Sequence, residues 1–387
     1  DLGRDDLAGG FLIPGLIDVH AHALVPTCDG AGFDEALSER LVAALLRFGV
    51  TTARSPATPT ARGVALRDRI AAGAIPGPRL LVAGELIDGR ETTPEAVRAE
   101  VDAQAAAGVD FVKLYSRLSP EAVRAGVETA HAHDLPVIGH LQRTSWTEGL
   151  AAGIDQLTHA APWTAEMLAP ADRAGYRDAV ARHGPMRARI DWLETLDPDG
   201  PEVGAVVDAL VRQRVPLDPT LVAFDTKFST DGTRPVAARY RDHPDRDAAE
   251  GLPALWEACG AETDAWTPDA FRRAEAAWPT LLALVRRYHE AGVRLTAGSD
   301  TPNTWVIPGE GLHRELELLA DAGLPPADVL RIATRNGAEA LGLLAEVGTV
   351  EAGKRADLVL LTADPLASIS NTRRIAWVMQ GGERVER

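Results

Sequence analysis

The sequence predicts an α/β fold built on a parallel (β/α)8 barrel, with a small β-rich region after it. Short apolar runs alternate with helical patterns eight times along the chain, as in a parallel barrel. Several of these runs end in His, Lys or Asp, and parallel barrels assemble their sites from the carboxyl ends of their strands. From residue 347 onward, short β-rich runs separated by Gly and Pro replace this alternation.

The eight barrel strands are expected where apolar runs lie between helical patterns. The run Phe11–Val19 has the continuous apolar character of a strand that is buried on both faces. Helices are expected between the strands, for example over Glu35–Leu46 and Glu121–Val127, where apolar residues recur at helical spacing. The expected strands lie near 16–20, 50–54, 79–84, 110–115, 136–140, 154–159, 216–221 and 294–299.

After the eighth strand, helices are expected around 310–323, 326–334 and 336–342. The runs Asp357–Leu361 and Ile375–Met379 then have the character of short strands between turns. These strands predict a small β domain next to the barrel.

Two intervals are longer than the usual loops of βα units, one between His159 and Val215 and the other between Leu221 and Arg294. Loops of this length over a barrel mouth often form lids and substrate walls. We expect their tryptophans mainly to pack peripheral helices together, with one or two at most in contact with substrate: Trp163, Trp192, Trp256, Trp266 and Trp278.

The composition excludes several classes of partner and site. The net charge of −16 argues against binding to nucleic acid. Cys28 and Cys259 are the two cysteines, too few for a disulfide scaffold or a thiolate zinc cluster, so metal ligands must be nitrogen and oxygen. No apolar run is long enough to predict a membrane span, and the first residues lack signal-peptide character, which predicts a cytoplasmic protein.

His20 and His22 close the first apolar run at alternate positions. Alternate side chains of a strand point the same way, so both imidazoles can reach one metal ion. Judged on this local sequence alone, a pair of solvated loop histidines is an equally good interpretation.

Four further residues end apolar runs where a strand would pass into a loop: Lys113, His140, His159 and Asp300. Because strand ends of a parallel barrel meet at one face, these side chains are expected to lie near His20 and His22.

Six motifs occur in order along nearly the whole chain: PGLIDVHAH, DFVKLY, PVIGH, DQLTHA, TAGSD and VGTVEAGKRADLVLL. With them the chain resembles the amidohydrolase superfamily, specifically its imidazolonepropionase-like and prolidase-like members. The resemblance implies a distorted (β/α)8 TIM barrel over residues 15–344 and a small β-sandwich domain built from the chain termini, 1–14 and 345–387. In relatives this sandwich takes more strands from before the barrel than the short segment here could supply, so we expect its N-terminal part to be truncated.

The same resemblance implies two divalent metal ions, with zinc expected, bridged by a carboxylated lysine and a hydroxide. His20, His22 and Asp300 would hold the first ion. His140 and His159 would hold the second ion, and Lys113 would bridge both.

Lys113 needs its own explanation, because an ammonium group has no lone pair for a metal. Desolvation and neighbouring positive charge both lower the pKa of a lysine. The neutral amine can then add carbon dioxide to form an anionic, bidentate carbamate. A salt-bridged lysine inside the barrel, or a lysine that acts as general base, are the alternatives.

In the implied mechanism a metal-bridging hydroxide attacks the substrate carbonyl. Asp300 takes the hydroxide proton and passes it to the leaving amine, or else it only caps the turn after the strand. Tyr115 shares the inward face of Lys113 and could donate a hydrogen bond to the oxyanion or to a substrate carboxylate, or serve in packing. Arg143 could clamp a substrate carboxylate, although surface exposure is the commoner outcome for an arginine.

The predicted function is therefore hydrolysis of an amide bond in a small substrate such as a dipeptide or an N-acyl amino acid. Three alternatives remain open. The same metal site could cleave a cyclic imidazolone, an ester or a phosphotriester. A mononuclear, deaminase-like enzyme is the second, and a barrel that has lost its catalytic site is the third, although none of the six ligand positions is substituted. A homo-oligomer is expected.

Overall fold

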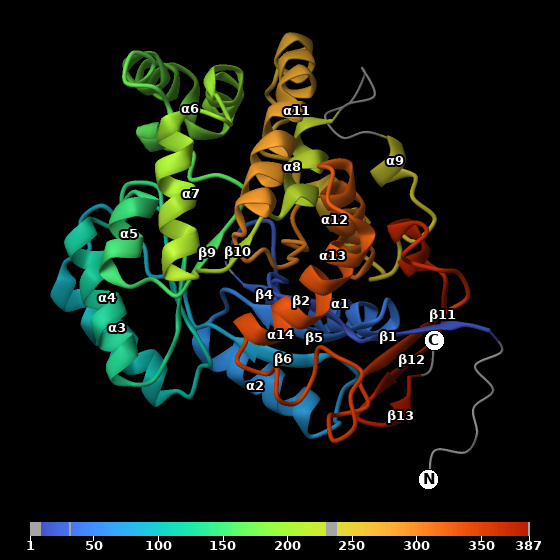
Figure 1. Cartoon of the computed structure of the whole chain (residues 1–387). Helices are drawn as coiled ribbons and strands as arrows, with labels where there is room; N and C mark the ends of the chain where they lie inside the picture. Colours follow the sequence, from blue (N-terminus) through green and yellow to red (C-terminus); the bar gives the residue numbers. More distant parts are fainter. Residues whose placement is uncertain (1–8, 31, 230–237, 386–387) are drawn as a thin grey trace.

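The computed structural model describes residues 9–30, 32–229 and 238–385, and Figure 1 shows how their helices and strands are arranged. Two parallel sheets form its centre, with strand orders β2-β5-β6 and β10-β9-β8-β7. Their strands are β2 (Leu16–Asp18), β5 (Val50–Ser55), β6 (Arg79–Val82), β7 (Val112–Leu114), β8 (Val137–Gly139), β9 (Gln156–Thr158) and β10 (Leu217–Asp218).

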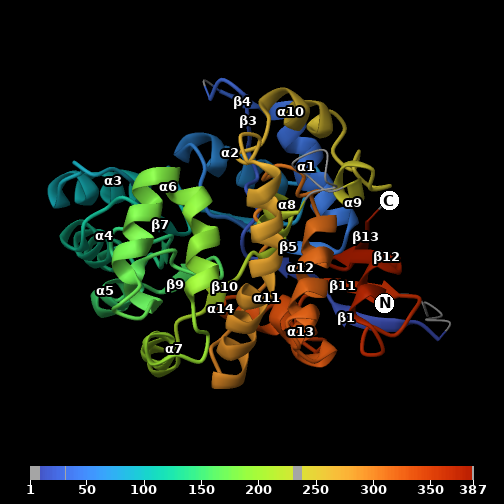
Figure 2. The same cartoon turned by 90° about the horizontal axis from the view of Figure 1, so that it is seen from above.

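Helices separate these strands and continue after them, as the alternating pattern predicts. They are α1 (Glu35–Arg47), α2 (Thr60–Ala71), α3 (Pro94–Ala106), α4 (Pro120–Ala132), α5 (Trp146–Ala152), α6 (Arg173–Thr195), α7 (Pro201–Gln213), α8 (Leu221–Phe228), α9 (Ala238–Arg241), α10 (Leu252–Cys259), α11 (Pro268–Ala291), α12 (Glu310–Asp321), α13 (Pro326–Arg331) and α14 (Gly337–Ala340). Seen from above, α3, α4 and α5 lie on one side of the molecule (Figure 2).

The sheets are joined by single contacts rather than by continuous ladders. Ala83 and Phe111 form an isolated parallel bridge between the β6 and β7 edges. The predicted strand at 294–299 is not a regular strand, although Leu295 bridges to Leu217 and the Val19 amide donates to the Ala297 carbonyl at 2.9 Å. The fold is therefore TIM-barrel-like, without one continuous closed sheet.

The chain termini meet in a separate antiparallel sheet of order β1-β11-β12-β13. It consists of β1 (Phe11–Pro14), β11 (Leu358–Leu361), β12 (Ile375–Gln380) and β13 (Glu383–Arg384), and it lies away from α3, α4 and α5 in both views (Figures 1 and 2). The described residues of the terminal segments form this one sheet, so the predicted β-sandwich is not confirmed. Residues 1–8 and 386–387 of the predicted small domain lie outside the described residues.

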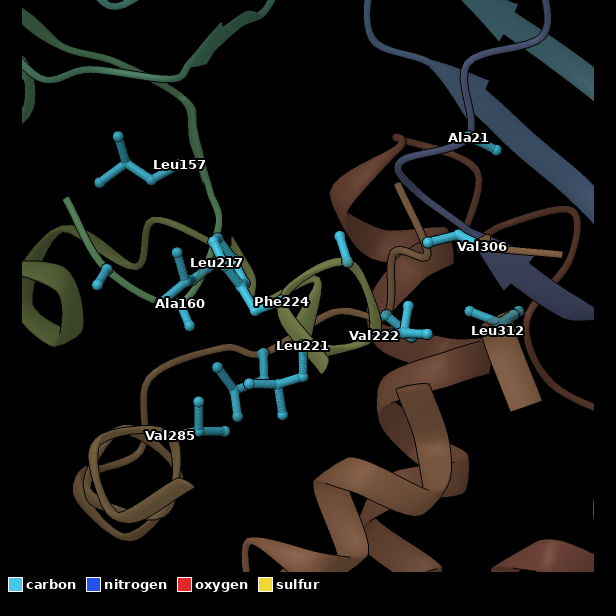
Figure 3. Packing of buried hydrophobic residues seen from close by; sticks show 14 of the residues in the cluster. Ala21, Leu157, Ala160, Leu217, Leu221, Val222, Phe224, Val285, Val306 and Leu312 are labelled. Carbon is cyan, nitrogen blue, oxygen red and sulfur yellow. The ribbon is translucent and has the colours of Figure 1, made fainter. Parts of the chain in front are cut away.

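Apolar helix faces and sheet residues make up the core. Asp34 begins α1 by accepting the Leu37 amide at 2.8 Å, and the helix buries Leu41 and Leu45 against the barrel. Burial of each such leucine contributes roughly 1.5–3 kcal/mol. Figure 3 shows part of this core, with Leu217 of β10 beside Phe224 of α8.

The two long intervals are largely helical. The first contains α6 and α7, and the second contains α8 to α11. Gly184, in a left-handed conformation with φ 77°, kinks α6 just before Pro185. The Trp163 and Trp192 rings pack 5.2 Å apart, in agreement with a packing role for these tryptophans.

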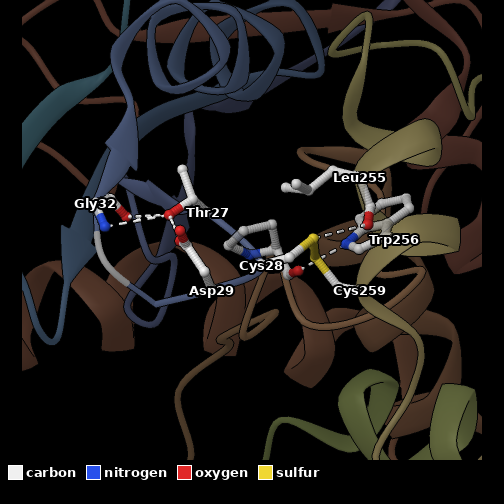
Figure 4. Close-up of a disulfide and its surroundings, with 8 residues drawn as sticks. Thr27, Cys28, Asp29, Gly32, Leu255, Trp256 and Cys259 are labelled. Atoms are coloured by element: carbon white, nitrogen blue, oxygen red, sulfur yellow. Dashed lines mark hydrogen bonds between the residues drawn. A yellow bond between two sulfur atoms is a disulfide. The ribbon is translucent and has the colours of Figure 1, made fainter.

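None of the described helices is long and apolar enough for a membrane span. Cys28 and Cys259 form a disulfide across a sequence separation of 231 residues. On the sequence, the two cysteines argued only against a disulfide scaffold, and this bond was not predicted. It ties α10 to the loop between β3 (Val25–Pro26) and β4 (Phe33–Asp34), as Figure 4 shows. Sequence alone could not pair these cysteines, because they are brought together only by the fold.

We expect the disulfide to stabilise the fold by restricting the unfolded chain. Closing so long a loop corresponds to ~2–4 kcal/mol in typical proteins. The exposed pair Cys28→Ser/Cys259→Ser should therefore lower the free energy of unfolding by about that amount in urea titrations. Dithiothreitol should destabilise the parent protein and leave the serine variant unchanged; equal stability of the two proteins would contradict this role.

Glu315 of α12 should make stability depend on pH. It is fully buried and accepts the Val222 amide at 2.8 Å, and burial, opposed by hydrogen bonds from Val222 and Leu221, raises its pKa from 4.5 to about 8. Because the folded state favours the protonated carboxyl, its contribution to stability is present at acid pH and is lost as the pH rises through 8.

Glu315→Gln should therefore remove part of this pH dependence. Between pH 5 and pH 8 the parent protein should lose roughly 3 kcal/mol more stability than the variant, measured by urea unfolding at each pH. Parallel pH profiles for the two proteins would show that Glu315 does not titrate in this range.

Candidate metal centre

A cavity of about 170 Å³ lies where the parallel strands end. It is lined by all six predicted ligands together with Tyr115: His20, His22, Lys113, His140, His159 and Asp300. Residues from segments 280 positions apart, such as His20 and Asp300, thus share one cavity, as the strand-end argument predicts.

His20 and His22 both face Asp300. Their Nε2 atoms lie 3.4 and 3.2 Å from the same oxygen, Oδ1 of Asp300. Strand β2 ends at Asp18, earlier than predicted, so the two histidines follow the strand instead of closing it. Both imidazoles still reach Asp300, because the bridge between Ala21 and Thr301 holds their segment beside the segment that carries Asp300.

His140, His159 and Lys113 form the other part of the cluster. Nε2 of His159 lies 2.9 Å from Nδ1 of His140, so two ring nitrogens face each other. The Lys113 amine donates to Thr158 Oγ1 at 3.3 Å, its single hydrogen bond to another described residue. The His20 and His159 rings are 5.2 Å apart, which joins the two parts.

The backbone is strained at this site. His159, Thr220 and Asp300 adopt left-handed conformations with φ of 71°, 50° and 58°. Residues with side chains rarely adopt this conformation unless the surrounding structure holds them in it, and such strain is common at functional sites. The local ladder hydrogen bonds persist, since the Asp300 amide donates to the His20 carbonyl at 2.7 Å.

Three histidines of the cluster are neutral at physiological pH: His20, His140 and His159. Burial lowers the pKa of His20, His140 and His159 well below 6.5, and nearby positive charge lowers it further at each of them. A neutral imidazole offers a lone pair, which is the form that binds a metal ion.

Two residues behind the cluster orient these rings. Asp218 Oδ2 contacts Nδ1 of His20 at 2.7 Å, and Thr220 Oγ1 contacts Nδ1 of His159 at 2.7 Å. These contacts leave both Nε2 atoms directed at the cluster, the arrangement typical of histidine ligands. Asp218 is the last residue of β10, but it lies inside the expected strand 216–221, so the strand-end criterion that found Asp300 missed it.

The charged groups differ in their protonation. Burial lowers the pKa of Lys113 to about 7, as the sequence argument expects for a lysine that becomes a neutral amine. Although burial opposes it, the electrostatic interaction with His20 and the hydrogen bond with His22 lower the pKa of Asp300 to about 2. Asp300 is therefore ionised at neutral pH.

Tyr115 lies at the cavity with its ring 4.4 Å from that of His140. Burial raises its pKa to about 12, so the phenol keeps its proton and can donate it in a hydrogen bond. Its hydroxyl has no hydrogen-bond partner among the described residues.

Arg143 does not line the cavity. Its exposed guanidinium donates to the carbonyls of Arg90 and Arg117, at 2.8 and 3.2 Å. The geometry thus gives no support to the predicted carboxylate clamp at this residue. Arg189, which no sequence motif singled out, lines the cavity instead.

The donor set fits a metal ion. His20, His159 and Asp300 each offer a ligand atom, and these atoms lie within 4.8 Å of one another. Neutral imidazole and ionised carboxylate are the oxygen and nitrogen ligands that zinc accepts. The facing nitrogens of His140 and His159 provide further donors beside this group.

Similar proteins differ in how much of the chain they match. An N-substituted formamide deformylase from Arthrobacter pascens is 39% identical over 104 residues, 25% of this chain and 19% of that protein. An imidazolonepropionase from Maricaulis maris is 27% identical over 381 residues, 96% of this chain and 83% of that protein. The chain thus spans only about a fifth of the deformylase.

Solved structures match nearly the whole chain. A Xaa-Pro dipeptidase with bound methionine has a TM-score of 0.68 at 18% identity, covering 98% of this chain and 87% of that chain. A bottromycin amidohydrolase has a TM-score of 0.68 at 23% identity, covering 97% and 77%. Both likenesses concern the fold.

A family model extends over most of the sequence. The amidohydrolase family matches residues 11–214 and 272–385, which include all six predicted ligands. The chain therefore belongs to the amidohydrolase family.

Proposed function

We propose that the protein is a binuclear metal-dependent hydrolase that cleaves the amide bond of a small substrate, such as a dipeptide or an N-acyl amino acid. One observation carries the proposal: four imidazoles, an ionised carboxylate and a lysine of lowered pKa share one cavity. The similar dipeptidase, deformylase and imidazolonepropionase are all named for substrates with carbon–nitrogen bonds.

Two ions, with zinc expected, would be held by this donor set. His20, His22 and Asp300 would hold one ion, and His140 and His159 the other. Lys113, as its carbamate, would bridge them. When bound, the ions would lower the pKa of a water molecule towards ~7 and polarise the substrate carbonyl.

The remaining roles fall to side chains of this protein. Asp218 and Thr220 keep the proton on Nδ1 of His20 and His159, so that Nε2 stays available. Asp300, ionised and 6% exposed, would accept a proton from the attacking water and return it to the leaving amine. Tyr115 would donate a hydrogen bond to the carbonyl oxygen as negative charge develops there.

A second candidate is hydrolysis of a cyclic amide such as an imidazolone. The match to the Maricaulis maris imidazolonepropionase covers 96% of this chain. The match to the deformylase covers 25% of it, and that to a second imidazolonepropionase 35%. Dipeptides, N-acyl amino acids, N-formyl amines and imidazolonepropionate, assayed side by side, would separate the two candidates. Esters and phosphotriesters belong in the same panel.

The division into domains is part of the proposal. Residues 15–344 contain every residue that lines the cavity, and the sheet formed by β1 with β11 to β13 contains none of them. The barrel region would therefore carry the whole active site, and the terminal sheet would act in folding or association.

Metal analysis tests the binuclear site. Purified protein should contain two zinc equivalents per chain by mass spectrometry of the metals. Chelation should abolish hydrolysis and lower the thermal midpoint, and added zinc should restore both. His159→Asn should hold about one equivalent or less, whereas the surface control His131→Asn should keep two. One equivalent or none in the parent protein would argue for a mononuclear site.

Substitution of Lys113 tests the bridge. Lys113→Ala should lower kcat by ~10³-fold or more, because both ions lose a shared anionic ligand. Acetate or propionate should restore part of the activity by taking the place of the carbamate, whereas Lys113→Arg should stay inactive. Full activity of the alanine variant would support the mononuclear, deaminase-like alternative.

A further inference from the structure

We infer that Arg189 is the anchor for a carboxylate on the substrate, so that the enzyme selects amides of free amino acids over neutral amides. The inference rests on the proposed function, because it assigns the substrate class of the same cavity. Arg189 lies on α6, after the kink at Gly184, and its side chain lines the cavity together with Tyr115 and His140.

The guanidinium of Arg189 is buried without a complete set of partners. The residue is 9% exposed, and its Nε atom is buried with no hydrogen-bond partner among the described residues. Within the described part of the chain its one hydrogen bond is a weak one, from Nη1 to the sulfur of Met186 at 3.3 Å. A guanidinium offers five N–H donors, so most of its capacity is unused.

No carboxylate of the described residues forms an ion pair with Arg189. A buried charge without a counterion is costly, and proteins keep such charges where a ligand supplies the partner. The other basic groups at the cavity are already occupied. Lys227 pairs with Glu262 at 3.0 Å, and Lys113 lies among the predicted metal ligands. Arg189 is therefore the cationic group available to a substrate there.

Two aromatic rings hold the guanidinium in place. Its central carbon lies 5.1 Å from the Trp163 ring and 5.4 Å from the Phe224 ring. Cation–π contacts stabilise the charge and leave the N–H edge free for hydrogen bonds. A planar, fixed N–H edge matches the two oxygens of a carboxylate, which gives selectivity as well as affinity.

The location fits a substrate that spans the cavity. The Phe224 ring, which contacts the Arg189 guanidinium, also lies 6.0 Å from the His159 ring, so the guanidinium is close to the predicted metal ligands without being one of them. Phe224 and Met186 add apolar surface to the same cavity. An N-acyl amino acid or a dipeptide offers an amide, an apolar side chain and a carboxylate in that relation.

Binding of uncleavable probes tests this assignment independently of turnover. The probes are the N-methylsulfonyl derivatives of glycine, alanine, leucine, phenylalanine and proline, each as free acid and as carboxamide. Calorimetry with zinc-loaded protein should show that the best acid binds about 100-fold more tightly than its carboxamide. In Arg189→Met this ratio should fall close to one, and in Arg189→Lys it should lie between the two.

Arg182→Met is the matched control. Arg182 is exposed on the same helix, and its substitution removes the same charge. Its acid-to-amide ratio should equal that of the parent protein. Zinc content and thermal midpoint would establish that the Arg189 variants are folded. If Arg189→Met does not fold, the comparison of Arg189→Lys with the parent protein decides the question.

The inference is overturned if the parent protein shows no preference for the acids, including no measurable binding of them, or if Arg189→Met keeps the preference. These outcomes are distinct from failure of the proposed function. A protein that prefers the acids but cleaves no amide would retain the carboxylate anchor and lose only the proposed reaction.

Discussion

The site depends on the close approach of two segments that lie almost 280 residues apart. Gly298 makes the approach possible, because a Cβ at this position would lie 2.6 Å from the Cβ of His20. The Asp18 carboxylate then accepts the Ser299 amide at 3.0 Å and the Ser299 hydroxyl at 2.6 Å. These contacts hold the segment that carries Asp300 next to His20 and His22. They therefore bring the Asp300 carboxylate into the same site as the two imidazoles.

Burial beneath this contact shifts the pKa of several groups around it. Arg54 is fully buried, with Nη2 3.7 Å from Asp218, and Asp218 in turn contacts His20. Burial raises the pKa of Asp18 and of Asp218 to about 7, whereas it lowers that of Lys113 to about 7. The buried base of the site thus keeps three imidazoles neutral and lowers the pKa of the lysine to near neutrality. Neutral imidazole and neutral amine are the forms that metal binding and carbamate formation require.

Much of the fold and the six cavity residues could be predicted because strand ends in a parallel arrangement converge whatever the loops do. The residues behind the ligands were harder to predict. Asp218 ends the observed strand β10, but the expected strand ran on to residue 221, so Asp218 did not stand out as a strand-end residue. Arg189 could not, because its position depends on how α6 bends at Gly184 and packs on Trp163 and Phe224, and no local pattern encodes that packing. The prediction of a regular strand at 294–299 was wrong. This segment contacts its neighbours singly, with Leu295 bridged to Leu217 and the Ala297 carbonyl bonded to the Val19 amide, and it passes directly into the left-handed Asp300.

The Cys28–Cys259 disulfide could not be predicted from local sequence either. It also bears on the cellular compartment in which the protein acts. Exposed disulfides are uncommon in a reducing cytosol, so the cytoplasmic location stays a prediction. Cys259 lies three residues before Glu262, whose carboxylate neutralises Lys227 at the edge of the cavity. The disulfide therefore ties the segment that leads into Glu262 to the loop between β3 and β4. Oxidised and reduced preparations of the protein would differ in a covalent link only three residues away from a charged residue of the cavity wall.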